Sequence, residues 1–275
     1  MCGLPASSTV ALMQKYFILW TALCFFCFRL EAHELDKFIN HIPAKDKQKL
    51  EKLFYGLINC DHFGYTLFGD KPVALSGHSY LTYWENFLSF QENEGLFWDS
   101  WNTWERYRMH FSFQNYLLHK EPSPFLDGGL IILINKKAFI ESIKAHLVTF
   151  ENILKHPIDP EKFLQGIESG KQTLMESIAC NTTLLGILLG YGKQNSVLYS
   201  HKRKVFNASC LNGNDDDLAS TPLLRIRSLC FMADLKSLET QLLHQKYSEM
   251  RRKLSSIYAG ENFFKTSLKR LMGES

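Results

Sequence analysis

Apolar residues recur at helical spacing over most of this chain. Between Ala44 and Asn59, the leucines, Phe54 and Ile58 fall on one side of a helix and the lysines fall on the other. Similar three- and four-residue steps predict several further helices. We expect them over Ser79–Arg108 with a break near Glu94-Gly95, Lys136–Lys155, Glu161–Glu168, Lys171–Tyr191, Asp234–Tyr258 and Glu261–Met272.

Short apolar runs predict only a few strands. Phe63–Phe68 and Val73–Leu75 flank the turn residues Gly69-Asp70-Lys71-Pro72, which predicts a hairpin. Gly128–Asn135 predicts another strand, which leads into the helix from Lys136. Strands this few and this irregularly spaced argue against a doubly wound sheet or a sandwich. The sequence therefore predicts an α+β fold: a mostly helical single domain with a small antiparallel strand element.

An N-terminal hydrophobic segment precedes that domain. Tyr16–Phe28 is almost wholly apolar, follows Lys15 and ends before Arg29, which is the layout of a secretory signal. As a helix it would cover about 20 Å, whereas the hydrocarbon core of a bilayer is about 30 Å thick. We expect residues 1–32 to be a signal peptide or, failing cleavage after Ala32, an N-terminal membrane anchor. A buried helix is the third interpretation. The domain then covers residues 33–275.

The charge balance limits the classes of partner, and the cysteine content limits the possible disulfides. The chain has 31 Lys and Arg against 28 Asp and Glu, and this near balance argues against nucleic acid as a partner. Outside residues 1–32, the cysteines are Cys60, Cys180, Cys210 and Cys230. In an exported chain they could form two disulfides in three possible connectivities, and buried free thiols are the alternative.

Ser79 is the one candidate nucleophile. In Gly77-His78-Ser79-Tyr80-Leu81 it follows an apolar strand and begins a predicted helix, as the serine of a hydrolase nucleophile elbow does. Leu81 stands where that motif needs its second glycine, and the chain lacks the alternation of strands and helices of such hydrolases. A helix cap at Ser79 explains the same residues. We therefore leave catalytic and binding residues unassigned.

Glycine and acidic motifs point to no cofactor or metal. Gly190-Tyr191-Gly192 begins a dinucleotide fingerprint, but Asn195 replaces its third glycine, and a helical pattern precedes it. Close helix packing at Gly186 and a helix end at Gly190–Gly192 are the better interpretation. Asn212–Asp217 lacks the glycine and glutamate that a calcium loop requires. We expect no cofactor and no metal site.

Aromatic residues are concentrated before residue 108. Trp84, Trp98, Trp101 and Trp104 lie close together in sequence, and the last three form one broad stripe on a helix. Such a stripe is usually part of a core. An aromatic binding groove and a membrane-interface belt are the alternatives.

The C-terminal region, residues 234–275, is an amphipathic helical segment. Leu235, Leu238 and Leu242 advance by three and four residues, and basic residues gather at Arg251-Arg252-Lys253 and Lys265–Arg270. We expect it to pack against the rest of the domain. Alternatively, it could contact an anionic membrane or a protein partner.

Two stretches resemble a family of uncharacterised bacterial proteins. The first is Phe63–Pro72, FGYTLFGDKP, and the second is Leu184–Gly192, LLGILLGYG. The resemblance implies a bacterial origin. It implies no activity, cofactor or catalytic residue.

Together, these observations favour a non-enzymatic protein of the cell envelope or the extracellular space, with a binding or structural role and an unknown protein or membrane partner. The alternatives are an exported serine hydrolase using Ser79 and a membrane-attached assembly component acting through residues 234–275.

Overall fold

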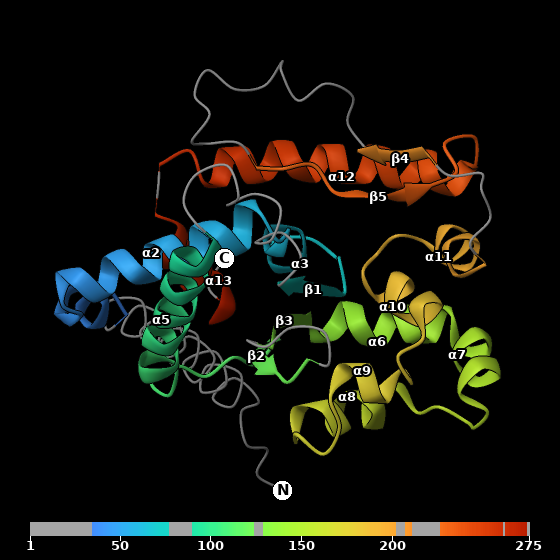
Figure 1. Ribbon diagram of the computed structural model, residues 1–275, viewed down its shortest axis with the longest axis horizontal. Helices are drawn as coiled ribbons and strands as arrows, with labels where there is room; N and C mark the ends of the chain where they lie inside the picture. The colour runs from blue at the N-terminus through green and yellow to red at the C-terminus, as the bar shows by residue number, and fades with distance from the viewer. Residues whose placement is uncertain are drawn as a thin grey trace, which may run out of the picture. The chain divides into compact units, whose positions relative to one another are not determined.

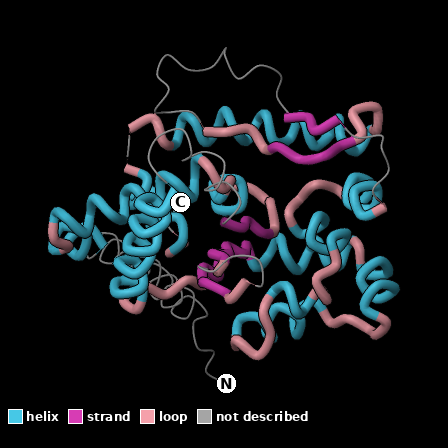
Figure 2. The backbone as a smooth tube through the Cα atoms, viewed as in Figure 1, coloured by secondary structure: helices cyan, strands magenta, loops and turns pink. Residues whose placement is uncertain are grey.

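The computed structural model describes residues 35–76, 90–123, 129–201, 207–210, 226–260 and 262–273. For residues 90–96, 207–210 and 230 it describes the backbone alone. Figure 2 shows a mostly helical chain with a few short strands. The predicted α+β class is confirmed, and the strands pair antiparallel.

The chain divides into two compact units, Met1–Lys47 and Gln48–Ser275. The first contains helical residues 35–41 and the start of α2. The expected cleavage point after Ala32 lies outside the described residues. All features discussed below belong to the second unit.

Figure 1 labels the elements. The strands are β1 (Val73–Ser76), β2 (Tyr116–Glu121), β3 (Leu130–Asn135), β4 (Asn207–Cys210) and β5 (Cys230–Ala233). The helices are α2 (Ala44–Asn59), α3 (Phe63–Leu67), α5 (Phe90–Arg108), α6 (Lys136–Ala145), α7 (Leu147–Leu154), α8 (Pro160–Glu168), α9 (Leu174–Ser177), α10 (Thr182–Leu188), α11 (Lys193–Ser200), α12 (Leu238–Ile257) and α13 (Phe263–Leu271).

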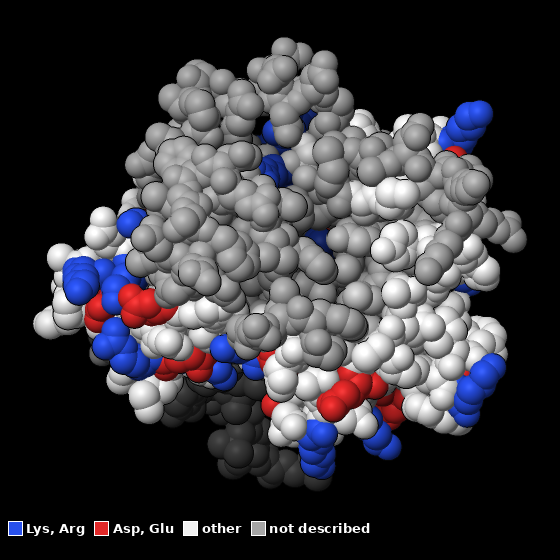
Figure 3. Space-filling view, in the orientation of Figure 1, with Lys and Arg blue, Asp and Glu red and all other residues white. Residues whose placement is uncertain are grey.

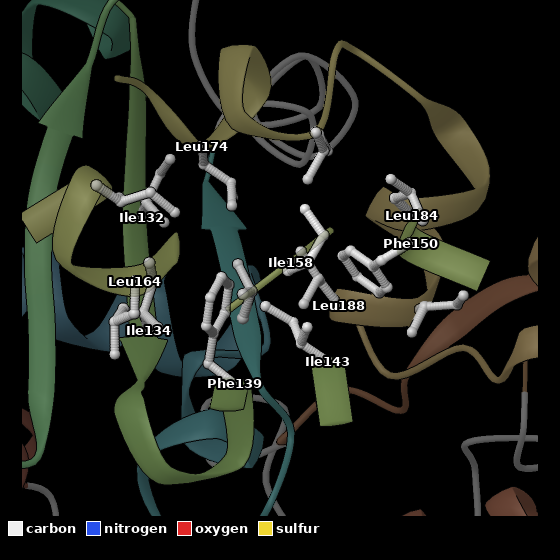
Figure 4. Close-up of a cluster of buried hydrophobic side chains, with 14 residues drawn as sticks. Ile132, Ile134, Phe139, Ile143, Phe150, Ile158, Leu164, Leu174, Leu184 and Leu188 are labelled. Atoms are coloured by element: carbon white, nitrogen blue, oxygen red, sulfur yellow. The ribbon is translucent and has the colours of Figure 1, made fainter. Parts of the chain in front are cut away.

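The central sheet has the order β1-β3-β2, with β3 antiparallel to both neighbours. On one face, Val73, Ile132 and Ile134 join a hydrophobic cluster built with α6 to α10. Figure 4 shows Phe139, Ile143, Phe150, Leu184 and Leu188 among the side chains of this cluster. Since side chains alternate along a strand, the neighbouring residues of β3 lie on the other face.

That second face is covered by α3, a short helix whose residues are all buried. Tyr116 and Asn135, which are partners in the β2–β3 register, bond to it from the sheet. The Tyr116 hydroxyl donates to the Leu67 carbonyl at 2.7 Å. The Asn135 amide donates to the Thr66 and Gly69 carbonyls at 3.3 and 3.2 Å. The sheet is therefore enclosed between α3 and the α6–α10 helices.

Three helix N-termini receive a carboxylate from a distant part of the chain. Glu51 accepts from Phe263 N and Phe264 N of α13 at 2.6 and 2.9 Å. The other two are Glu121 on α9 at Leu174 N and Glu239 on α11 at Lys193 N and Gln194 N. Each carboxylate satisfies amide groups that a helix leaves without an internal acceptor.

The predicted hairpin over Phe63–Leu75 is wrong. Phe63–Leu67 forms α3, while β1 pairs with β3 rather than with its sequence neighbour. A run that is buried on every side carries neither a period of two nor a period of 3.6. Its aromatic and β-branched composition therefore favoured a strand by propensity alone.

Several predicted helices have different bounds. The helix over Lys136–Lys155 is interrupted at His146, where α6 ends and α7 begins. The helix over Lys171–Tyr191 divides into α9 and α10, because Ala179 and Cys180 adopt positive φ angles and Asn181 caps a new helix start. The expected break at Glu94-Gly95 is absent, since α5 continues through both residues.

The helix over Ala44–Asn59 is confirmed at both ends. The helix expected from Glu161 is confirmed as α8, which begins at Pro160 after the cap Asp159. β2, β4, β5 and α11 were not predicted, because each is short and carries too few periodic positions.

We predict that Gly186→Ala destabilises the protein. A methyl group on Gly186 of α10 would lie 2.5 Å from Ser196 Oγ and 2.9 Å from Ser196 Cβ, both on α11. Moving α11 to make room should cost about 1–3 kcal/mol of unfolding free energy. Gly166→Ala in α8 is the matched control, because its nearest neighbour is 3.9 Å away. It should raise stability by up to about 1 kcal/mol. Urea denaturation of both variants measures the difference, and equal stabilities would contradict close packing at Gly186.

Candidate functional site

Ser79, the candidate nucleophile, lies outside the described residues, as do Gly77, Trp84 and Asn212–Asp217. The aromatic stripe is described in part. Trp101 and Trp104 are buried, which confirms the core interpretation for these two side chains. Trp98 is half-buried, with Lys120 Nζ 4.2 Å from the centre of its ring.

The glycine motif is structural, as predicted. α10 ends at Leu188, and Gly190 and Gly192 have φ angles of 77° and 83°. A side chain on Gly190 would meet Tyr247 Oη and the stem of Lys71. The amides that follow Gly192 are already bonded to Glu239. A phosphate at this position would have to displace that carboxylate.

A buried polar centre is formed by the part of the chain that connects α2 to β1. Sequence reasoning missed this centre. It contains Cys60, Asp61, His62 and Lys71, all within one segment of the chain. Lys71 is only 2% exposed, and its Nζ donates to the Val73 carbonyl. His62 has a φ of 62° and a Nδ1 that is buried and without a hydrogen-bond partner among the described residues.

Tyrosines surround this centre. Tyr65 donates to the Arg227 carbonyl at 2.9 Å, and its ring makes edge contacts with His62 and Tyr247. Tyr247 donates to the Gly190 carbonyl at 2.8 Å. The stretches Phe63–Pro72 and Leu184–Gly192 therefore meet here, since one holds Lys71 and the other holds Gly190.

Burial controls the charge of the centre. It lowers the pKa of Lys71 to about 7, and it lowers the pKa of His62 to about 3 with help from the nearby Lys71 and Arg227 charges. Burial, and then the Asp61 charge, raise the pKa of the Cys60 thiol to about 11. At neutral pH the Cys60 thiol and the His62 imidazole are therefore uncharged. The Lys71 amine is uncharged in about half of the molecules. A neutral amine can act as a base or nucleophile, but Lys71 and Cys60 are both closed off from solvent. We interpret the centre as part of the core.

The cysteines differ in environment. Cys60 is buried and Cys180 is exposed. Cys210 and Cys230 are partners in the β4–β5 register.

The C-terminal segment is part of the core, as expected. Tyr247 and Leu254 of α12 and Phe264 and Leu268 of α13 are buried. Two of its basic residues bond to the backbone of the same unit. Arg251 Nε donates to the Ile226 carbonyl, and Arg270 Nε donates to the Leu67 carbonyl. Arg251 is buried, and Arg270 is half-buried.

One part of this segment faces outward. Leu235, Leu238 and Leu242 are 53%, 70% and 58% exposed, on and just before the first turns of α12. Leu238 and Leu242 lie on one side of the helix, opposite Thr240, Tyr247 and Arg251, which are buried, and Leu235 lies in the turn before the helix. We call these three residues the leucine face.

On the side drawn in Figure 3, described Lys and Arg residues lie among Asp and Glu. Ion pairs such as Lys136–Glu168 and Lys144–Glu161, at 2.7 and 2.6 Å, account for part of this mixing. Within the described ranges, no helix combines the length and apolar character needed to cross a bilayer. The same residues include no cluster of three metal-binding side chains.

Comparisons with models of known protein families, with curated proteins and with solved structures found no match.

We predict that Lys71 makes stability rise with pH. Its pKa of about 7 in the folded protein lies below the ordinary value of 10.5, so the unfolded chain binds more protons between these values. Stability is therefore lowest below pH 7 and increases above it, by about 3 kcal/mol between pH 7 and 9.5. Lys71→Met should remove this increase in urea unfolding experiments. Lys246→Met, at an exposed pair with Asp70, should keep it. Parallel pH profiles for wild type and Lys71→Met would contradict the prediction.

We predict that His62 contributes to acid destabilisation. Its folded pKa of about 3 is below the ordinary 6.5, so its stabilising effect is complete above pH 6.5 and is lost as the pH falls towards 3. His62→Asn tolerates the positive φ angle and should reduce the stability loss between pH 6.5 and 4 by about 3 kcal/mol. His201→Asn, on an exposed residue, is the control. The measurement is thermal or urea unfolding at each pH, and an unchanged acid limb in His62→Asn would refute the assignment.

Proposed function

We propose that this chain is an exported protein that acts by binding a protein partner in the cell envelope or outside the cell. In this proposal the leucine face is the contact surface. The observation that carries it is the exposure of Leu238 and Leu242, one turn apart on a helix whose opposite side is already buried, with Leu235 exposed just before that helix. The apolar Tyr16–Phe28 segment supports export.

The leucine face is not needed to fix α12 in the fold. Tyr247, Arg251 and Leu254 attach the helix through its other side, and Ser237 caps its N-terminus by accepting from Thr240 N at 3.2 Å. Apolar side chains left in water by an otherwise anchored helix are typical of a contact surface.

The chemistry of the surface favours a protein with an apolar groove. Leu238 and Leu242 are one helical turn apart, which is the spacing of anchor residues in helix-in-groove recognition. Their surroundings carry both signs of charge, with Lys236 exposed, Glu239 bonded to α11 and Lys246 paired with Asp70. A surface that binds anionic lipid would instead be mainly basic.

The test is the double variant Leu238→Gln/Leu242→Gln, since glutamine has nearly the helix propensity of leucine. Burying both leucines should contribute about 3 kcal/mol to binding. The double variant should therefore reduce the amount of partner cross-linked from a photoreactive residue at position 245 by about 10²-fold. Val148→Gln is the matched control, because Val148 on α7 is also 70% exposed. It should leave the yield unchanged.

Urea unfolding of the same variants completes the experiment. Both should remain within about 0.5 kcal/mol of wild type, as expected for exposed positions. Loss of folding in the double variant would assign the leucines to the core. Unchanged cross-linking, or cross-linking to lipid alone, would reject a protein partner at this face.

A further inference from the structure

The β4–β5 pair brings two cysteines together. In the antiparallel register, Cys210 lies opposite Cys230, at the end of the ladder where residues 211–229 leave one strand and return to the other. Of the pairings open to the four cysteines, the register of this strand pair favours Cys210 with Cys230.

The backbone geometry of directly opposed residues suits a disulfide. Opposed Cα atoms in an antiparallel pair are about 4.5 or 5.5 Å apart, depending on whether the pair is hydrogen-bonded. A disulfide requires a Cα separation of about 4.4–6.8 Å. Register partners also project to the same face of the ladder, whereas a shift of one residue would place them on opposite faces.

The surrounding structure gives such a bond a role. β5 is held in the fold, because Phe231 and Ala233 are buried, Tyr191 stacks on Phe231 at 4.5 Å, and Asp234 N donates to Asn195. In the part of the chain that the structure describes, β4 has β5 as its one strand neighbour. A two-stranded sheet is marginal by itself in water. A bond between the strands would fasten β4 to the anchored β5.

We propose that Cys210 and Cys230 form a disulfide that closes the segment 211–229. The two thiols lose two protons and two electrons as the S–S bond forms, and an acceptor disulfide is reduced to two thiols. The acceptor is glutathione disulfide in vitro and a dithiol oxidase in an exported setting. The oxidised state in the cell depends on the export that is part of the proposed function, whereas the pairing itself does not.

The first experiment uses the full chain in a glutathione redox buffer. After free thiols are blocked under denaturing, non-reducing conditions, peptide mapping should find residue 210 linked to residue 230, with Cys60 and Cys180 alkylated. In native limited proteolysis, reduction should increase the rate of cleavage within 207–233 by about 10²-fold, from the loop-closure entropy that the bond removes. Alkylation of both Cys210 and Cys230 would overturn the proposal, as would a bond between other cysteines.

The matched control moves one thiol by one residue. Cys210→Ser combined with Ser209→Cys places the thiol opposite Phe231 and on the other face of the ladder. This variant should form no bond to Cys230, and a linked peptide in it would show that proximity in a mobile chain, not the register, brings the thiols together. The wild-type result stands even if this variant does not fold.

Disulfide mapping of the protein isolated directly from its host distinguishes the proposed Cys210–Cys230 pairing from the proposed export. A linked pair in both samples supports pairing and export. A linked pair in redox buffer with reduced thiols in the host supports the pairing and counts against export.

Discussion

The buried backbone of α3 is the constraint on which the second unit depends. Its last carbonyls lie away from water and are bonded by side chains from three distant places: Asn135 at the end of β3, Tyr116 on β2 and Arg270 on α13. A buried carbonyl without a partner costs about 1–3 kcal/mol. The sheet and the C-terminal helix must therefore reach their positions together for this short helix to be stable.

The same solution recurs at the helix starts. Glu51, Glu121 and Glu239 each bind the N-terminus of a helix that lies far away in sequence, and Glu121 does so from within the sheet. Helices as short as α9 could not persist alone, and here their ends are completed by residues that fold elsewhere. Much of the tertiary organisation thus depends on hydrogen bonds between side chains and the backbone groups at helix ends.

This explains which parts of the fold could be predicted from the sequence. α2 and α12 each have one exposed and one buried side, so the periodicity of their apolar residues was sufficient to predict a helix. α3 is buried on every side, and β2 is short. Neither therefore had a periodicity of apolar residues that could identify its secondary structure. The breaks at His146 and Cys180 depend on backbone angles that local composition did not indicate.

The candidate sites, too, could be predicted only where the local sequence pattern indicated burial or a turn. Burial of Trp101 and Trp104 could be predicted from their spacing, and the turn at Gly190–Gly192 from its glycines. The polar centre could not, because nothing in Asp70-Lys71-Pro72 distinguishes a buried lysine from a turn lysine. The leucine face was visible as a pattern. Which side of α12 is exposed depended on partners such as Gly190 and Ile226, which lie far from it in sequence.

In the proposed binding role, the bonding around Asn195 has a consequence for recognition at the leucine face. This buried asparagine bonds to Thr240 Oγ1 at 3.0 Å and accepts from Asp234 N at 3.0 Å, while Glu239 holds α11. The turn that carries Leu235 and the first turn that carries Leu238 are thereby held in one conformation before any encounter. Such preorganisation leaves little conformational entropy to be lost on association. Affinity at a surface of this kind is set mainly by how slowly the complex dissociates.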